Sequence, residues 1–527
     1  MRLRVFRGLS CEKGTPACVF KRRKGKPLET LRWMDLAVLA AYLGGTTALG
    51  CAFARRSRTT EGFTAARRRV PGWAVGLSIL GTYVSSISFL ALPGKALDAD
   101  WSFFVFSLTL PIAAWIAVRW FVPFYRAIGE VSAYHHLEAR FGSWARTYAA
   151  ACYLLTQIAR MGTISYLVAL AMAPLVGWSI EGIILLTGGA VVVYTLVGGI
   201  EAVIWTDVVQ SLVLAAGALA AAGALLAGMP EGPLQAFRIA AEHDKFSLGS
   251  LAWRWDEATF WVILLYGLTI NLQNFGIDQN YVQRYVVARS PRDAARSVWL
   301  GGLLYVPISA VFFLIGTLLF AYYQAWPERL PPGLDPHATP DRVFPQFIVR
   351  GLPPGMAGLV VAGIFAAAQS TLSSSLNGSA TLLLRDVYQR YFRAAAGERE
   401  SMLVLYVGTL LMGILGTGAA LAMTRVRTAL DAWWELAGVF SGGMLGLFLL
   451  GLLVPTARGK AAAAGVIGGV VVIAWMTLSP TPRWPASLAA LRSPFHPLWI
   501  PLAGTLAILG LGLAASRLGG HQEVQLR

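Results

Sequence analysis

Arg160 is a charged residue deep within a long apolar stretch of the chain. An arginine at the centre of a bilayer costs about 2.5–3.5 kcal/mol, so we expect its side chain to face other helices and to bind an anion. The paired N–H donors of a guanidinium match the two oxygens of a carboxylate. We therefore predict that Arg160 binds the carboxylate of a ligand. The alternative is a structural arginine bonded to helix-end carbonyls or to Asp207.

A stripe of small hydroxyl residues lies in a later apolar stretch. Ala367, Ser370, Thr371 and Ser374 are spaced i, i+3, i+4 and i+7, so they share one face of a helix. Hydroxyl and carbonyl oxygens are the ligands that a hard cation needs, and neutral ligands suit an ion that must also leave. The stripe therefore indicates a cation site. The alternative is that small residues merely allow two helices to pack closely.

Asp207 is an acidic residue about one turn inside the end of another apolar stretch. A carboxylate within a membrane is by default a candidate ion ligand, and the alternative is a carboxylate solvated by water at the membrane surface. Neither the 4 cysteines nor the 6 histidines show the spacing of a zinc site or a disulfide framework. We therefore expect this chain not to be an enzyme.

The elements that would position these residues are membrane helices. The 527 residues are 56% hydrophobic and only 13% charged, and the mean hydropathy is +0.59. These values exclude a soluble enzyme, because a water-exposed surface needs more polar residues. Apolar runs of about 20 residues, which span the roughly 30 Å of hydrocarbon, recur along the chain. The net charge of +17 lies largely in short loops, where it indicates topology and not nucleic-acid binding.

Thirteen spans are predicted, and their number places the two termini on opposite sides. Their ranges are 33–54, 73–96, 102–125, 144–174, 180–198, 203–228, 258–276, 297–325, 356–391, 402–423, 432–454, 461–478 and 498–516. The loops after odd-numbered spans carry more Lys and Arg than the others, and Arg284 is one of these residues. The positive-inside rule therefore predicts a cytoplasmic C-terminus and an external N-terminus.

The segment 1–33 conflicts with this topology, because residues 1–32 carry ten Lys and Arg on the predicted external side. It also lacks the apolar region of a signal peptide. We expect native translation to begin at Met34, directly before the first span. The alternative is a basic tail whose effect is outweighed by thirteen spans.

Two of the predicted spans are interrupted by polar residues. Thr82–Ser88 is rich in hydroxyl groups and precedes Pro93, and Asn271–Gly276 closes the seventh span, five spans later. Interrupted spans at corresponding positions in two groups of five are typical of transporters built from inverted repeats, with the binding site near the middle of the membrane.

The sequence resembles the solute:sodium symporter family over about residues 34–516. The motifs that carry this resemblance are Tyr194–Gln210, Asp278–Tyr285 and Ser370–Tyr388. The sequence is most similar to the bacterial sodium:sialic acid symporter branch, through Arg69–Trp73, Ser132–Tyr134, Leu137–Phe141 and Phe365–Ser370.

The resemblance implies two sodium sites and a substrate site. The first sodium site corresponds to backbone carbonyls of Gly81, Val84 and Ala367 and to hydroxyls of Ser370 and Thr371. The second corresponds to Asp207, Ser370, Ser373 and Ser374. The substrate carboxylate would bind Arg160, with hydroxyls from Ser85, Ser86 and Ser88, and Phe103 matches an aromatic neighbour. Two positions depart from the branch: Tyr83 replaces a threonine and Ser107 a glutamine, so part of the sugar-contacting wall has changed.

The resemblance implies an all-α polytopic protein of the leucine-transporter type, with two inverted five-helix repeats and about 13 transmembrane helices. We expect a single transporter domain over 34–516, a short cytoplasmic tail over 517–527, and a location in the cell (cytoplasmic) membrane. The predicted function is sodium-coupled import of a small organic acid, such as a sialic acid or related carboxylated sugar. The alternatives are a neutral sugar or other solute as substrate, or a uniporter without ion coupling. Beyond the lipid bilayer and the substrate, we expect no nucleic acid and no required protein partner.

Overall fold

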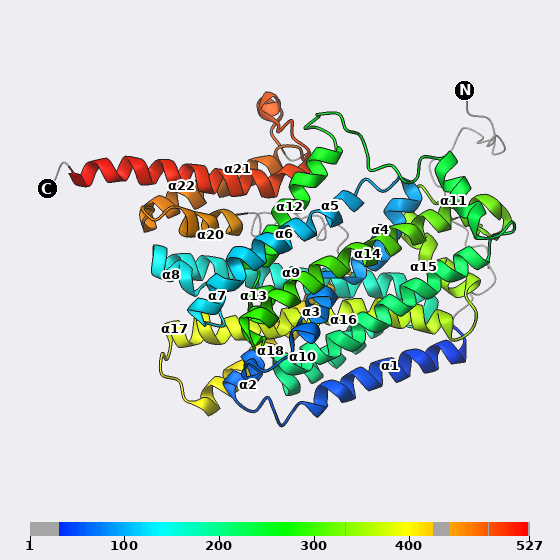
Figure 1. The fold of residues 1–527 in the computed structure, drawn as a ribbon, viewed down its shortest axis with the longest axis horizontal. Helices are drawn as coiled ribbons and strands as arrows, with labels where there is room; N and C mark the ends of the chain where they lie inside the picture. Colours follow the sequence, from blue (N-terminus) through cyan, green and yellow to red (C-terminus); the bar gives the residue numbers. More distant parts are fainter. Residues whose placement is uncertain (1–30, 333, 425–442, 483, 525–527) are drawn as a thin grey trace.

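The computed structural model describes residues 31–332, 334–424, 443–482 and 484–524. These residues form helices that run mainly along one direction of the molecule (Figure 1). The only β-type pairing among them is an isolated bridge between Val70 and Ala288. The predicted segment 1–33 lies almost entirely outside the described residues, as does the first part of the predicted span 432–454.

The helices fall into a long set that forms the bundle and a short set at its ends. The long helices and the halves of broken helices are α1 (Trp33–Ala52), α3 (Gly72–Tyr83), α4 (Ser86–Asp98), α9 (Ser143–Val176), α10 (Ile180–Ala227), α12 (Phe260–Ile277), α14 (Pro291–Ala325), α16 (Met356–Leu382), α18 (Glu398–Met423), α21 (Gly459–Leu478) and α22 (Ile500–Val524). The shorter ones include α2 (Thr60–Ala65), α5 (Phe104–Leu108), α6 (Leu110–Ile116), α7 (Val122–Ile128), α8 (His135–Phe141), α11 (Pro233–Glu242), α13 (Gln279–Val287), α15 (Val343–Gly351), α17 (Gln389–Tyr391) and α20 (Met444–Leu453).

The described residues contain ten helices that are long and apolar enough to cross a membrane, or eleven if α3 and α4 count as one broken span. This is two fewer than the thirteen predicted spans. One difference arises because the predicted spans 180–198 and 203–228 lie in one element, α10. The other arises because only the ten-residue α20 is described from the predicted span 432–454.

The 48 residues of α10 would extend for about 72 Å as a straight helix, more than twice the thickness of the hydrocarbon core. The chain instead breaks at Gly199, which has a φ of +56°. A Cβ atom there would lie only 2.8 Å from Cα of Phe63. Both arms lie near the same turn of α16. In the first arm, Tyr194 Oη donates to the Gln369 carbonyl. In the second arm, Asp207 lies beside Gly81 of α3, and Ser370 of α16 lies beside the same glycine. The two predicted spans are therefore the two arms of α10.

Two helices of the bundle are interrupted. Val84 and Ser85 have extended backbone angles between α3 and α4, and Asp278 is extended between α12 and α13. The first break falls within the predicted Thr82–Ser88 interruption, and the second follows the predicted Asn271–Gly276 interruption directly. Each break leaves backbone carbonyls outside the helical hydrogen-bond pattern, where side chains can bind them. At the second break, Tyr125 Oη donates to the Gly276 carbonyl at 2.7 Å and Tyr285 Oη donates to the Phe275 carbonyl at 2.8 Å.

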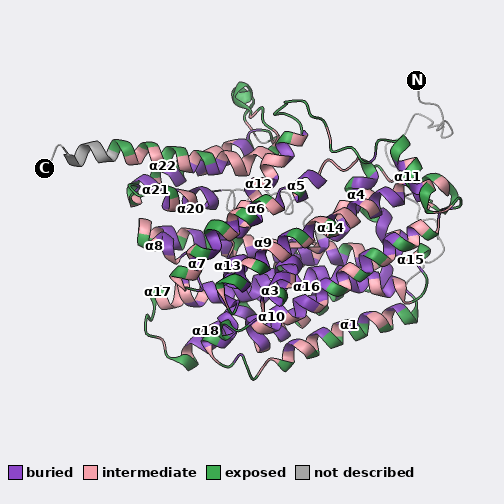
Figure 2. Cartoon of the chain, viewed as in Figure 1, coloured by how far each residue is buried: buried purple, intermediate pink, exposed green. Residues whose placement is uncertain are grey.

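The centre of the bundle is formed by α16. In the segment Met356–Tyr391, which contains this helix, 89% of the 18-residue apolar stretch is buried inside the protein. Figure 2 shows buried residues concentrated there, whereas α1 and α22 at the periphery are more exposed. α1 begins at the end of the bundle that carries α11 and α15, and α22 ends on the side of α8 and α17 (Figure 1). A site between α3, α16 and the second arm of α10 is therefore enclosed by other helices.

Candidate functional site

The end of α3 supplies oxygen atoms to the first predicted sodium site. The last backbone hydrogen bond of α3 joins the Val84 N–H to the Leu80 carbonyl, so the carbonyls that follow are free to face other groups. Ser370 Oγ donates to the Gly81 carbonyl at 2.7 Å, which joins α16 to α3. Val84 is buried at the break itself.

The same turn of α16 supplies the other oxygens. Ser370 Oγ and Thr371 Oγ1 lie 3.2 and 3.1 Å from the Ala367 carbonyl. Both hydroxyl residues are only 1% exposed. The structure therefore brings Gly81, Ala367, Ser370 and Thr371 together in a water-poor environment. Neutral carbonyl and hydroxyl oxygens at one point are a donor set that fits a sodium ion.

The second predicted sodium site contains a cationic side chain that sequence analysis assigned to a loop. Arg284 on α13 is 1% exposed, and its Nη2 donates to Asp207 Oδ2 at 2.9 Å and to Ser374 Oγ at 2.7 Å. Its Nε donates to Ser78 Oγ at 2.8 Å, and its Nη1 donates to the Asn280 carbonyl at 2.7 Å. The placement of Arg284 in a cytoplasmic loop is therefore wrong. Its charge is buried because Asp207 and three neutral oxygens bind it.

The Arg284 guanidinium does not satisfy every oxygen of the second site. Asp207 Oδ1 is buried and has no hydrogen-bond partner among the described residues. Ser373 Oγ and Ser374 Oγ both donate to the Ser370 carbonyl, at 3.1 and 2.8 Å. Since a buried carboxylate oxygen without a partner is costly, Oδ1 and these hydroxyls offer ligands to a small cation beside the Asp207–Arg284 pair.

Arg160 is a half-buried arginine in the middle of α9 that the protein binds only weakly. Its one hydrogen bond in the described part of the chain runs from Nη2 to the Thr82 carbonyl and is long, at 3.4 Å. Asp207, the structural partner that the sequence left open, pairs with Arg284 instead. The carboxylate of Asp278 forms no ion pair with a described residue, and it caps α13 by accepting a hydrogen bond from the Asn280 N–H at 2.8 Å. Arg160 therefore keeps donors for an anion.

The predicted substrate hydroxyls lie at the start of α4, beside the break. Ser85 Oγ accepts a hydrogen bond from the Ser88 N–H at 3.3 Å and caps the helix. Ser86 Oγ is buried and lacks a hydrogen-bond partner within the described ranges. The N-terminus of a helix carries a partial positive charge. The start of α4 and Arg160 together can therefore bind an anion.

Aromatic rings fill the wall where the sequence departs from the sialic acid branch. The ring of Tyr83 lies 4.7 Å from that of Tyr305 and 5.8 Å from that of Tyr281, and its Oη accepts from Asn274 Nδ2 at 3.1 Å. Ser107 Oγ lies 2.7 Å from Ser309 Oγ on α14.

Tyr305 is a residue that sequence analysis missed. Its ring packs against that of Tyr83, and Ser309, one turn later on the same helix, lies beside Ser107. An aromatic residue in an apolar span gives no signal of such a role, because most of them only fill space.

Phe103 lies apart from this group. Its ring is 5.5 Å from Lys95 Nζ near the outer end of α4. It also packs against the apolar cluster of Ala96, Phe104 and Phe313. Phe103 therefore lies toward the end of the bundle, whereas the predicted substrate serines Ser85, Ser86 and Ser88 lie at the break.

Comparison with known proteins identifies the class of molecule to which this site belongs. The family model described as "Sodium:solute symporter family" matches residues 63–469. The chain belongs to the sodium:solute symporter family. It is thus a multi-pass, sodium-coupled solute symporter and not an enzyme.

Two curated relatives of this symporter are bacterial. The sodium/sialic acid symporter SiaT of Proteus mirabilis (strain HI4320) is 35% identical over 449 residues, which cover 85% of this chain and 90% of the relative. The sodium/sialic acid symporter NanT of Aliivibrio fischeri (strain ATCC 700601 / ES114) is 34% identical over 84% of this chain and 87% of its own length.

Two solved structures show the fold. A sodium-coupled sialic acid symporter in a substrate-bound, outward-open state has a TM-score of 0.85 at 32% identity, over 92% of this chain and 98% of the other. Mhp1, a nucleobase-cation-symport-1 family transporter, has a TM-score of 0.55 at 17% identity, over 86% of this chain and 94% of its own. The all-helical, leucine-transporter-type fold of the symporter is confirmed.

Proposed function

We propose that this symporter imports a small carboxylated solute and that a sialic acid or a related acidic sugar is the class it accepts. The observation that carries this proposal is Arg160, a guanidinium in the centre of the bundle that forms one hydrogen bond, of 3.4 Å, with the described residues. A carboxylate would bind its paired donors, and the hydroxyls at the start of α4 would bind the rest of the ligand. The 35% identity to a sialic acid symporter supports the same class.

Sodium would be bound at two places. The first is the group of Gly81, Val84, Ala367, Ser370 and Thr371. The second is the group of Asp207, Ser370, Ser373 and Ser374, beside the Arg284 guanidinium. An ion at the first place joins α3 to α16 and fixes the break from which α4 starts. Because a ligand shifts a conformational equilibrium only through its different affinities for the two states, sodium that orders this break would favour the state that binds substrate.

The two broken helices would occupy equivalent positions in two inverted five-helix repeats. Movement of one repeat against the other would then expose Arg160 alternately to the two sides of the membrane. We place the C-terminus in the cytoplasm and the start of α1 outside, from the positive charges of the loops. The inward sodium gradient would then drive uptake.

We expect purified protein in proteoliposomes to take up labelled N-acetylneuraminate when an inward sodium gradient is imposed, because the substrate-binding state depends on sodium. Replacing external sodium by choline should abolish the uptake. Sodium-independent uptake at the same rate would instead identify a uniporter. Sodium-driven uptake of a neutral sugar, with no competition by carboxylates, would contradict the assigned substrate class.

The second sodium site leads to a prediction about cooperativity. The single substitution Asp207→Asn would leave Arg284 as an unpaired buried charge, which costs about 3–5 kcal/mol. We therefore choose the double variant Asp207→Asn/Arg284→Gln, which removes both charges of the pair at once. The Hill coefficient for sodium-dependent uptake should fall from about two to about one, because one of two coupled sites is lost.

A second buried ion pair provides the matched control. Arg146 and Asp386 also bind each other inside the protein, near α8 and α17, and away from both sodium groups. The variant Arg146→Gln/Asp386→Asn should lower the unfolding temperature without changing the Hill coefficient. A wild-type Hill coefficient of one, unchanged in the Asp207 double variant, would show that this group binds no transported sodium.

A further inference from the structure

The helix α1 lies at the edge of the bundle, yet its buried side carries polar groups. The buried residues of this helix are Asp35, Leu39, Tyr42, Thr46 and Gly50. They are spaced by three or four residues, so they form one stripe along α1. An apolar stripe would suffice to pack a helix, and a buried polar side chain is costly unless it is hydrogen-bonded. Asp35 and Tyr42 both form these bonds with α16.

The two polar residues of α1 bind different parts of α16. Asp35 Oδ1 accepts hydrogen bonds from the N–H groups of Gly355 and Gly358, at 2.7 and 2.8 Å, and so caps the start of α16. Tyr42 Oη donates to Gln369 Oε1 at 2.7 Å. Gln369 lies about 17 Å further along the axis of α16 than Gly358. The first contact therefore fixes the end of α16, and the second fixes its middle.

A second tyrosine binds the same residue of α16. Tyr194 Oη, in the first arm of α10, donates to the Gln369 carbonyl at 3.3 Å. In an α-helix this carbonyl also accepts the N–H of Ser373, four residues later. A Cβ atom at Gly50 of α1 would lie only 2.6 Å from Cβ of Tyr194, so this glycine lets α1 pack directly against the tyrosine. The helix α1 thus contacts this turn of α16 directly through Tyr42 and indirectly through Tyr194.

The position of Gln369 determines the rotation of α16 about its own axis. Gln369 faces α1, whereas the next residue, Ser370, faces α3 and donates to the Gly81 carbonyl. A rotation of α16 by about 10° would move its Cα atoms by about 0.4 Å, since they lie about 2.3 Å from the axis. A metal site tolerates errors of only about 0.2 Å in its ligand distances. Because Gln369 Nε2 is buried without a hydrogen-bond partner among the described residues, the orientation of this side chain depends on Tyr42.

We infer that Tyr42 is a positioning residue for sodium: through Gln369 it sets the rotation at which the hydroxyl stripe of α16 faces the ions. This inference rests on the proposed function, since it concerns the two sodium sites proposed above. The helix α1 acts on these sites without supplying a ligand. Its hydroxyl group at Tyr42 serves as an outer-shell partner of the residues that bind the ions.

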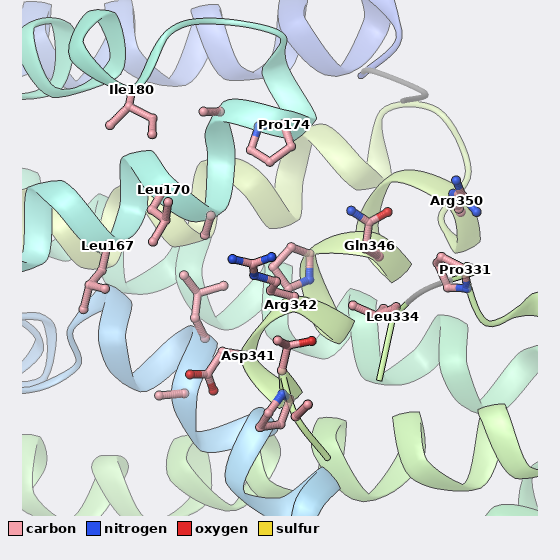
Figure 3. A pocket seen from close by; sticks show the side chains of 18 of the residues that line it. Leu167, Leu170, Pro174, Ile180, Pro331, Leu334, Asp341, Arg342, Gln346 and Arg350 are labelled. Carbon is pink, nitrogen blue, oxygen red and sulfur yellow. The ribbon is translucent and has the colours of Figure 1, made fainter. Parts of the chain in front are cut away.

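This role of α1 is separate from the open space elsewhere in the bundle. A cavity of about 880 Å³ lies between α4, α9 and the segment that includes α15 (Figure 3). None of the described residues that line it belongs to α1, α3 or α16. A substitution at Tyr42 therefore leaves the cavity unchanged, and its effect on sodium affinity reports on α16 and not on access through the cavity.

A sodium titration of the unfolding temperature tests this role. Sodium is the only probe, so the outcome does not depend on which solute is carried, and bound sodium raises the stability of the native state. Tyr42→Phe keeps the ring and removes the hydroxyl, so it should weaken sodium binding by about tenfold, as the loss of an outer-shell partner does at metal sites. Asp35→Asn is the matched control, because it changes the other contact between α1 and α16. It should lower the unfolding temperature in potassium and leave the sodium affinity unchanged.

A double-mutant cycle tests whether Tyr42 acts through Gln369. Gln369→Leu should also weaken sodium binding, and adding Tyr42→Phe to it should have no further effect. If Tyr42→Phe is too unstable to titrate, Tyr194→Phe removes the other tyrosine hydroxyl from the same turn and should weaken sodium binding in the same way.

Three results would overturn the inference: a wild-type sodium affinity in Tyr42→Phe, equal losses of affinity in Tyr42→Phe and Asp35→Asn, or additive losses in the Tyr42 and Gln369 variants. If sodium does not stabilise the wild type at all, the proposed sodium sites themselves fail. A normal wild-type response with an unimportant Tyr42 removes only the role of α1.

Discussion

Replacing Arg160 by alanine is expected to lower the affinity for the carboxylated substrate by at least about 30-fold, because truncating one partner of a buried charge pair costs about 2–5 kcal/mol. The fold should survive this change. Within the described part of the chain, Arg160 contributes one hydrogen bond, of 3.4 Å, to the protein. Arg160→Lys keeps the charge but loses the planar pair of donors, so it should bind the substrate markedly more weakly than the wild type.

The chemical part of this prediction uses an amide analogue of the substrate. The analogue should bind the wild type far more weakly than the acid, whereas Arg160→Ala should bind acid and amide almost equally. Equilibrium binding to purified protein in saturating sodium measures the four affinities. Arg119→Ala serves as the matched control, since Arg119 is an exposed arginine of another apolar helix that lies beside Trp120. Equal affinity of the wild type for acid and amide would contradict carboxylate binding by Arg160.

Features that depend on local sequence could be predicted well. The break after Tyr83 was visible because hydroxyl residues and a proline interrupt an apolar run, and the hydroxyl stripe of α16 was visible from its helical spacing. The contact of Ser370 with the Gly81 carbonyl follows from these two features once α3 and α16 pack together. The same reasoning separated the two arms of α10, whose junction at Gly198–Gly199 has no side chains to fill the turn.

Features that depend on long-range packing could not be predicted. Arg284 follows a span by a few residues, and in a linear reading such an arginine belongs to a basic loop. Only the fold shows that α13 turns inward at Asp278 and carries Arg284 to Asp207. A signal was nevertheless present, because Gln279, Asn280, Gln283 and Arg284 form a run of hydrogen-bonding side chains directly after a polar interruption. Such a density of donors is typical of a buried network more than of a loop.

Removing the hydroxyl of Thr371 is expected to weaken sodium binding by more than about tenfold, since loss of even an outer-shell partner costs a metal site 10–100-fold in affinity. Thr371 is informative because it belongs to the first proposed sodium site alone, whereas Ser370 belongs to both. Thr371→Ala should therefore shift one sodium-binding step, and Ser370→Ala/Thr371→Ala should shift both. In addition, Ser370→Ala removes the hydrogen bond that joins α16 to Gly81, so its effect on folding must be measured separately.

The unfolding temperature of the purified protein reports both effects. In potassium it measures the cost of the substitution to folding. Its rise with added sodium measures affinity, because a ligand that binds only the native state stabilises it by RT ln(1 + [L]/Kd). Ser375→Ala is the matched control: it removes a buried hydroxyl from the same helix, but one that donates to Gln157 Oε1 at 2.7 Å. It should lower the unfolding temperature in potassium and leave the sodium titration unchanged. If Ser370→Ala/Thr371→Ala gave the wild-type sodium titration, the oxygens at the end of α3 and on α16 would not be the sodium ligands.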